Sequence, residues 1–179
     1  PVVGMPHNLA PTPMPAGLRL MLGAGLGLLM LQIALGGWVS TNYAVLVCDS
    51  FPQCQGSYWP AMNFAQGFEW WRPLGYTAQG ELLSFQALTA IHYVHRLGAY
   101  AVIPAMLALA WGMHRHGLTS HALALGLLVL LQLLTGLSNV VLGWPMPAAI
   151  LHTGGAAAMV VVLVLAWPRK LTHNRVTTA

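Results

Sequence analysis

Four long apolar runs constrain the fold of this chain more than any other feature. They span residues 20–39, 85–113, 122–144 and 148–167, and the only charged side chain in any of them is Arg96. At about 1.5 Å of rise per residue, a helix of about 20 residues crosses the roughly 30 Å hydrocarbon layer of a membrane. Hydrophobic residues make up 57% of the chain and charged residues only 6%, which is unlike a soluble domain. We therefore predict an all-α membrane protein, a bundle of four transmembrane helices.

Basic residues near the ends of these runs predict how the helices are oriented. Arg19, Arg115 and a basic tail at residues 169–179 fall on one side of the membrane, whereas Arg72 falls on the other. Because positively charged residues in short loops stay in the cytoplasm, we expect both ends of the bundle there and one large extracytoplasmic loop at residues 42–84. The net charge of +4 then reflects membrane topology, and no basic groove or aromatic platform indicates nucleic-acid binding.

Composition divides the chain into three parts. Residues 1–16 are rich in proline and have no hydrophobic period, which is typical of a linker. Residues 17–168 hold the four-helix transmembrane domain, which contacts membrane lipid, and residues 169–179 form a cytoplasmic basic tail. The chain begins with Pro1 and lacks the charged start, short apolar core and cleavage site of a secretory signal. We therefore expect it to be part of a longer protein.

The only two cysteines, Cys48 and Cys54, lie close together in the large loop. An extracytoplasmic loop meets an oxidising compartment, in which neighbouring thiols pair. We predict a structural disulfide; the alternatives are a redox-active pair that exchanges with an external thiol carrier, and two free thiols. The loop also contains all three acidic residues, Asp49, Glu69 and Glu81. No span is therefore expected to carry a carboxylate, which excludes most carboxylate-based proton relays within this chain.

His95 and His152 are the candidate metal ligands. Histidine is rare in membrane spans and usually functional there. Counted from the outer ends of their helices, His95 is about 15 Å deep and His152 about 8 Å deep, so the two side chains can face each other in the outer half of the bundle. Paired axial imidazoles are a common way for a four-helix bundle to hold a heme. The alternative is that each histidine only hydrogen-bonds a neighbouring helix.

Two residues beside His95 suit an anionic cofactor. Arg96 is costly within a membrane unless it is paired, and a heme propionate would supply the negative charge that the spans lack. His92 lies one turn from His95 on nearly the same helix face. We expect it over the cofactor edge, against the cofactor carboxylates, or facing the lipid headgroups, and we do not predict it as an axial ligand.

A short repeat links the first and third spans. LQIALGG and LQLLTGL place Gln32 four residues before Gly36, and Gln132 four residues before Gly136. Each is followed by a span with one candidate histidine, which suggests two hairpins related by a pseudo-two-fold axis with the cofactor between them. Two alternatives are chance, because leucine and glycine are abundant here, and a simple role for the glutamines in joining helices by hydrogen bonds.

The order of these motifs resembles one known family. ALGGWVSTNYAVLVCDSFPQCQG, ALTAIHYVHRLGAY and GLSNVVLGWPMPAAILHTGGAA are together similar to the carboxy-terminal half of bacterial heme A synthase, over roughly residues 17–167. The resemblance implies an oxidoreductase of the bacterial inner membrane, with the cysteine loop in the periplasm. Such an enzyme converts the C8 methyl group of heme O into the formyl group of heme A, for heme-copper terminal oxidases, by successive hydroxylation and loss of water.

In that family two similar four-helix halves are fused, one for the substrate heme and the other for a heme B. The axial ligands of the second half match His95 and His152, and its outer cysteine pair matches Cys48 and Cys54. The substrate half carries a glutamate three positions before its first ligand, whereas this chain has His92. The chain therefore resembles the half that binds heme B. The resemblance places the catalytic carboxylate in a half that this chain lacks. We expect the chain either to be joined to an amino-terminal half or to assemble with a second copy as a homo-oligomer.

Two other classes of function fit part of the pattern. A membrane b-type cytochrome with a bis-histidine heme, acting only in electron transfer, needs the same histidines but not the cysteine loop or the order of motifs. A small transporter or channel subunit predicts polar residues along a path across the membrane, whereas the candidates here cluster in the outer half. A copper site is disfavoured because the nine methionines are scattered.

Overall fold

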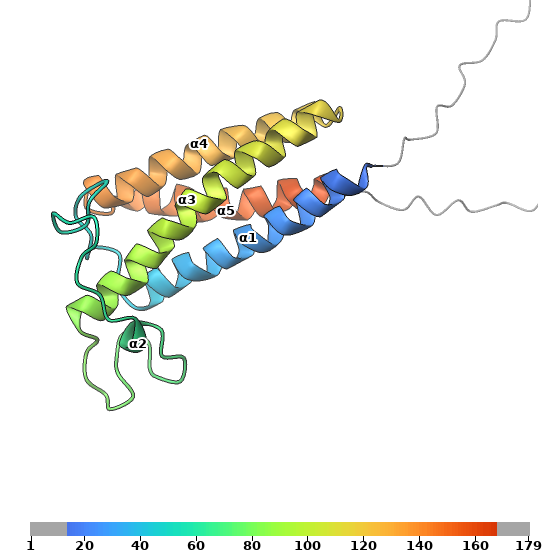
Figure 1. The fold of residues 1–179 in the computed structure, drawn as a ribbon. Helices are drawn as coiled ribbons and strands as arrows, with labels where there is room; N and C mark the ends of the chain where they lie inside the picture. Colours follow the sequence, from blue (N-terminus) through green and yellow to red (C-terminus); the bar gives the residue numbers. More distant parts are fainter. Residues whose placement is uncertain (1–13, 168–179) are drawn as a thin grey trace, which may run out of the picture.

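The computed structural model describes residues 14–167 as a bundle of four long helices (Figure 1). Its helices are α1 (Ala16–Thr41), α2 (Phe64–Gly67), α3 (Phe85–Arg115), α4 (Thr119–Val141) and α5 (Met146–Ala166). All but the short α2 are long and apolar enough to cross a membrane, which confirms the predicted all-α fold with four spans. The predicted basic tail and nearly all of the predicted linker lie outside the described residues.

The apolar runs located each span to within a few residues. α1 begins at Ala16, four residues before its run, directly after Pro15. α4 ends at Val141 because the chain then turns sharply, with positive φ angles of 67° at Gly143 and 62° at Trp144. Glycine adopts that left-handed conformation freely, whereas a tryptophan adopts it rarely. The turn therefore places the start of α5 directly beside the end of α4.

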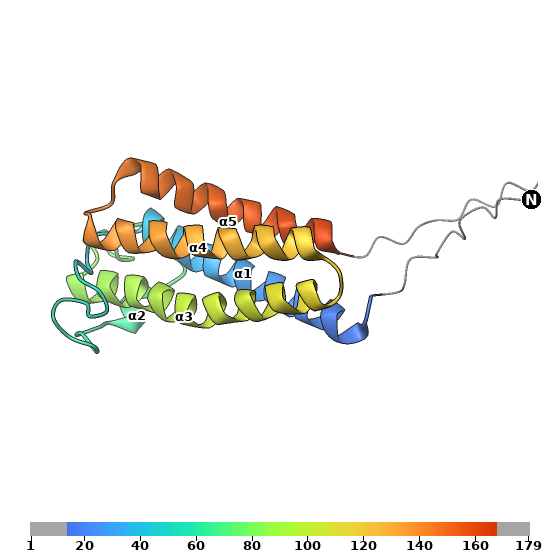
Figure 2. The same ribbon diagram turned by 90° about the horizontal axis from the view of Figure 1, so that it is seen from above.

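The four long helices form two antiparallel hairpins. α1 packs along α3, α4 packs along α5, and α3 joins the two pairs by packing along α4, whereas α1 and α5 touch over a shorter stretch. α3 and α5 therefore lie diagonally opposite each other, and Figure 2 shows α4 between them. We call the end of the bundle that carries residues 42–84 the loop end, and the end where α1 begins and α5 finishes the terminal end (Figure 1).

The tightest packing lies toward the terminal end. Each long helix contributes a fully buried side chain there, namely Leu22, Met106, Leu125 and Leu163. Nearer the loop end α4 and α5 bury less: α4 has no buried residue after Thr135, and α5 has none before Gly155. The helix segments around His152 are thus less tightly packed than the terminal end of the bundle.

A second, smaller hydrophobic cluster fastens the loop to the bundle. It consists of Val39, Ala44, Val47, Leu83, Ala87 and Ile91, which come from α1, the loop and α3. The Ser84 side chain caps α3 by accepting a hydrogen bond from the Ala87 amide. The loop is therefore a folded layer against the helix ends rather than a free connection.

Candidate functional site

His95 lies on α3 and is held by residues of α1. Nε2 of Gln32 donates a hydrogen bond to the His95 carbonyl oxygen at 2.9 Å and lies 3.0 Å from His95 Nδ1. One turn further along α1, a Cβ atom at Gly36 would come within 3.1 Å of His95 Cε1. A Cβ atom at Gly98, one turn after His95, would collide with the end of the Gln32 side chain. Both glycines are thus required for this close fit.

His152 lies on α5 and is held by α4 in the same way. Nε2 of Gln132 donates to the His152 carbonyl oxygen at 2.9 Å. A Cβ atom at Gly136 would come within 3.1 Å of His152 Cε1, and one at Gly155 would collide with the Gln132 amide. The glutamine and glycine positions of the sequence repeat therefore make equivalent contacts in the two hairpins.

The hydrogen bond at Nδ1 decides which nitrogen of each ring carries the proton. Oγ1 of Thr135 lies 3.0 Å from His152 Nδ1, and the same hydroxyl donates to the Leu131 carbonyl oxygen at 2.7 Å. With its one proton used there, the hydroxyl accepts the Nδ1 proton of His152, which leaves a lone pair on Nε2. In residues 14–167 Nε2 of neither His95 nor His152 takes part in a hydrogen bond. His152 therefore has the usual arrangement of a metal ligand. At His95 the amide nitrogen of Gln32 can only donate, so Nδ1 accepts and the ring proton lies on Nε2. Ligation of a metal through Nε2 of His95 requires that proton to move to Nδ1.

The two imidazoles suit a flat tetrapyrrole between them. They come from diagonally opposite helices and are half-buried. A heme would be held by one imidazole on each face, and the missing side chains at Gly36 and Gly136 leave room for the two rings. Among the described residues, no group of three or more His, Cys, Asp and Glu side chains is arranged to hold a metal ion. The donor set therefore fits a heme better than a bare metal ion.

His92 has a different environment from the two candidate ligands. It is only 5% exposed, so it does not face the headgroups, and its Nδ1 lies 2.8 Å from the Ala44 carbonyl oxygen. This hydrogen bond ties α3 to the chain just after α1. The expected position of His92 over the edge of a cofactor stays a prediction.

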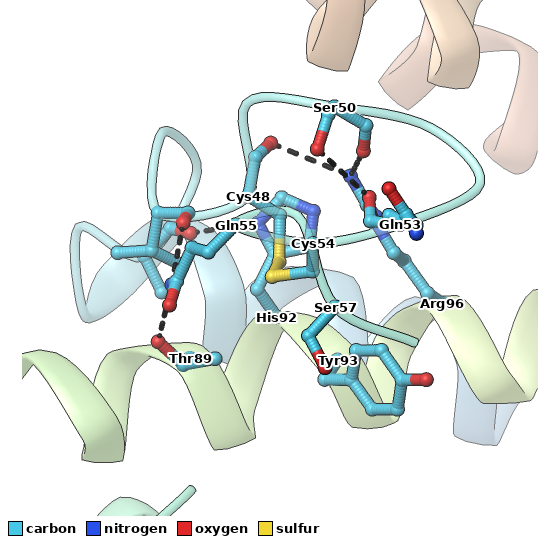
Figure 3. The surroundings of a disulfide bond; sticks show 12 residues. Cys48, Ser50, Gln53, Cys54, Gln55, Ser57, Thr89, His92, Tyr93 and Arg96 are labelled. Carbon is cyan, nitrogen blue, oxygen red and sulfur yellow. Dashed lines mark hydrogen bonds between the residues drawn. A yellow bond between two sulfur atoms is a disulfide. The ribbon is translucent and has the colours of Figure 1, made fainter. Parts of the chain in front are cut away.

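Arg96 fastens the segment between the cysteines, as Figure 3 shows. Its guanidinium donates to the carbonyl oxygens of Ser50 at 2.9 Å, Gln53 at 3.0 Å and Cys48 at 3.3 Å. The predicted propionate partner is untested, but the structure supplies neutral partners that sequence reasoning missed. Carbonyl oxygens satisfy most donors of the cation, although its buried Nε has no partner among the described residues.

Cys48 and Cys54 form a disulfide, which confirms the predicted pairing and makes the free-thiol alternative wrong. Both cysteines are buried, at 1% and 0% exposure. Gln55, next to the bridge, donates to the Val47 carbonyl oxygen and to Thr89 Oγ1 of α3, both at 2.9 Å. The bridge thus closes a loop that is held to α3 on both sides of His92 (Figure 3). Whether it also exchanges with an external thiol is untested.

A second arginine holds the remainder of the large loop. Nη1 of Arg72 donates to Asn42 Oδ1 at 2.8 Å, and Nη2 donates to the Gly67 carbonyl oxygen at 3.2 Å. The guanidinium also lies 5.3 Å from the ring centre of Trp38, a cation–π contact. Burial lowers the pKa of Arg72 from its ordinary value, and the charge of Glu69 opposes that shift. Arg72 and Arg96 therefore fasten different parts of the same loop.

Sequence reasoning missed two residues of the site. Gly98 could have been found, because it and Gly155 both stand three residues after a candidate histidine. Thr135 carried no comparable signal, since the equivalent position in the first hairpin is Leu35.

Comparison with known proteins identifies relatives over most of the chain. Residues 3–164 match the family model COX15-CtaA, described as a cytochrome oxidase assembly protein. The chain is 34% identical to a heme A synthase of Shewanella oneidensis over 150 residues, which cover 81% of this chain and 46% of that protein. It is 31% identical to a heme A synthase of Sphingopyxis alaskensis over 162 residues, covering 87% and 41% respectively. The chain thus spans less than half the length of these relatives, and no solved structure matches it.

Proposed function

Because the chain belongs to the COX15-CtaA family of cytochrome oxidase assembly proteins, we propose that it is the cofactor-binding half of a heme A synthase, with a heme B held between His95 and His152. The observation that carries this proposal is the pair of imidazoles on diagonally opposite helices, each packed against a glycine of the neighbouring helix. The relatives named heme A synthase support the enzyme over a cytochrome that acts only in electron transfer.

The reaction belongs to the intact enzyme, which oxidises the C8 methyl group of heme O to the formyl group of heme A. We assign the substrate site and the catalytic carboxylate to a further half, because this chain spans less than half of its relatives. His92 supports the assignment, since it stands where the substrate half of the family carries a glutamate and instead bonds a backbone carbonyl. When bound, the heme supplies one-electron transfer. The residues of this chain hold and orient its ligands.

We place the chain in the bacterial inner membrane, with the loop end in the periplasm. The disulfide between Cys48 and Cys54 supports an oxidising compartment at that end. Arg19 lies at the start of α1 and Arg115 at the end of α3, so both are at the terminal end of the bundle. This supports a cytoplasmic location for the terminal end.

An absorption spectrum of the purified chain tests the cofactor. We expect oxidised and reduced spectra of a low-spin b-type heme, and pyridine extraction should release heme B. An a-type or o-type heme would instead place substrate or product in this bundle. A chain purified without any heme from heme-replete membranes would contradict the proposed site.

Ligand variants test the two histidines. We expect His95→Ala and His152→Ala each to abolish stable heme retention while membrane insertion continues. His114→Ala is the matched control, because His114 lies exposed in the last turn of the same helix as His95, and it should retain heme fully. Wild-type spectra in both ligand variants would show that the axial assignment is wrong.

A further inference from the structure

We infer that Gln32 and Gln132 are positioning residues, each of which sets the direction of one heme ligand from the neighbouring helix. This inference rests on the proposed function. Each glutamine works with three other residues in an arrangement that we call a clasp. The first clasp is Gln32, Gly36, His95 and Gly98, and the second clasp is Gln132, Gly136, His152 and Gly155.

The glutamine of each clasp donates to the backbone carbonyl oxygen of the histidine, and Gln32 alone also contacts the ring. A side chain of α1 therefore holds a peptide group of α3, and a side chain of α4 holds a peptide group of α5, both at 2.9 Å. Within a membrane no water competes for such a bond. Because a side chain leaves a helix in a direction fixed by its own backbone, a bond to that backbone fixes the rotation of the helix and hence the direction of the imidazole.

The glycine one turn after each glutamine sets how close the ring lies. At Gly36 and Gly136 a Cβ atom would approach Cε1 of the ring to 3.1 Å, which is closer than ordinary van der Waals contact. An alanine at either position would push the ring away by a few tenths of an ångström. The backbone of the histidine is therefore held by the glutamine, and its ring packs against a glycine of the neighbouring helix.

The glycine after each histidine makes the glutamine bond possible. A Cβ atom at Gly155 would displace the end of the Gln132 side chain, and one at Gly98 would displace the end of Gln32. Gly155→Ala thus removes the contact without changing either the glutamine or the histidine. Its neighbour Gly154 has nothing within 4 Å of a Cβ atom, so Gly154→Ala is a matched control on the same helix.

The test compares the full chain with Gln132→Leu, Gly155→Ala and Gly154→Ala in lipid nanodiscs. The rate of heme transfer to excess apomyoglobin measures retention, and the electron paramagnetic resonance spectrum of the oxidised heme reports the orientation of the two imidazole planes. Groups that support a metal ligand typically affect affinity by about 10- to 100-fold. We expect heme loss to be about tenfold faster in Gln132→Leu and Gly155→Ala, with shifted low-spin signals, and wild-type behaviour in Gly154→Ala.

The outcomes separate this inference from the proposed function. If the wild-type chain holds a low-spin heme and both altered chains match it in transfer rate and spectrum, the clasp is refuted while the heme site stands. If the wild-type chain holds no heme, the proposed function itself fails, and the inference fails with it. Should Gln132→Leu not insert, Gly155→Ala decides alone, since it leaves every hydrogen-bonding side chain in place.

Discussion

Replacing Arg96 by glutamine tests how the cysteine segment is attached to the ligand-bearing helix. The guanidinium of Arg96 is buried and donates to three carbonyl oxygens between Cys48 and Gln53. Glutamine keeps a polar side chain at the site but is shorter and has no positive charge. We expect the segment to open more often while the four spans stay packed.

The contact distances give the size of the effect. The bonds to Ser50 at 2.9 Å and Gln53 at 3.0 Å are well formed, whereas the bond to Cys48 at 3.3 Å is long. A hydrogen bond to a charged group contributes about 1.5–3 kcal/mol, so the two short bonds contribute about 3–6 kcal/mol. Part of this free energy is offset by the cost of burying the cation and by the hydrogen bonds to water that form when the segment opens. We therefore take the lower value, about 3 kcal/mol, which corresponds to roughly a hundredfold in the opening equilibrium.

Hydrogen exchange measures that opening directly. The amides of Cys54 and Ser57 each donate to the carbonyl oxygen of the other residue, at 2.9 and 3.1 Å, so they exchange only when the segment opens. We expect both amides to exchange about a hundredfold faster in Arg96→Gln. Arg72→Gln is the control, because Arg72 shares the acceptor Asn42 with the amide of Gly75. It should accelerate exchange at Gly75 and leave Cys54 unchanged.

Unchanged exchange at Cys54 and Ser57 in Arg96→Gln would refute the reasoning. The competing hypothesis, in which Arg96 pairs mainly with a heme propionate, predicts that result together with a weaker affinity for heme. The two roles of the same side chain are therefore separated by one variant and two measurements.

Two further perturbations probe the packing and the bridge. A Cβ atom at Gly25 would come within 2.9 Å of Leu109 Cδ2, whereas one at Gly27 would meet nothing within 4 Å. We expect Gly25→Ala to destabilise the bundle by about 1–3 kcal/mol through overpacking, and Gly27→Ala to leave its stability unchanged or raise it. Thermal unfolding in detergent measures both effects. Replacing Cys48 and Cys54 together by serine removes about 2 kcal/mol of loop-closure stabilisation, so exchange should accelerate within the loop while the unfolding temperature of the bundle stays the same. A clear fall in that temperature would mean that the bridge also supports the spans.

The spans were predictable because they depend on composition alone. A run of about 20 apolar residues needs no knowledge of its neighbours to be assigned as a membrane helix. The ends were less predictable because they depend on single residues. The early start of α1 follows from Pro15, and the end of α4 follows from the left-handed conformation at Trp144, which sequence patterns do not show.

The site was predictable in part for a similar reason. Gln32 and Gln132 were visible as a repeat, and their partners proved to be the candidate histidines. The acceptors of Arg96 were not predictable, since every residue has a carbonyl oxygen and nothing in the sequence marks which of them approach a side chain more than 40 residues away. The sequence therefore indicates only a partner of opposite charge, although backbone oxygens also stabilise a buried cation.

The location of the two clasps has a mechanical consequence. Each clasp lies within one hairpin, the first between α1 and α3 and the second between α4 and α5. The aim of each imidazole is thus set inside its own hairpin. The spacing between the two imidazoles is set separately, by how the hairpins dock, mainly along α3 and α4. A slight tilt of one hairpin against the other would change that spacing while the orientation of each ring within its hairpin stays the same. The distance between the two imidazoles is therefore independent of their orientations.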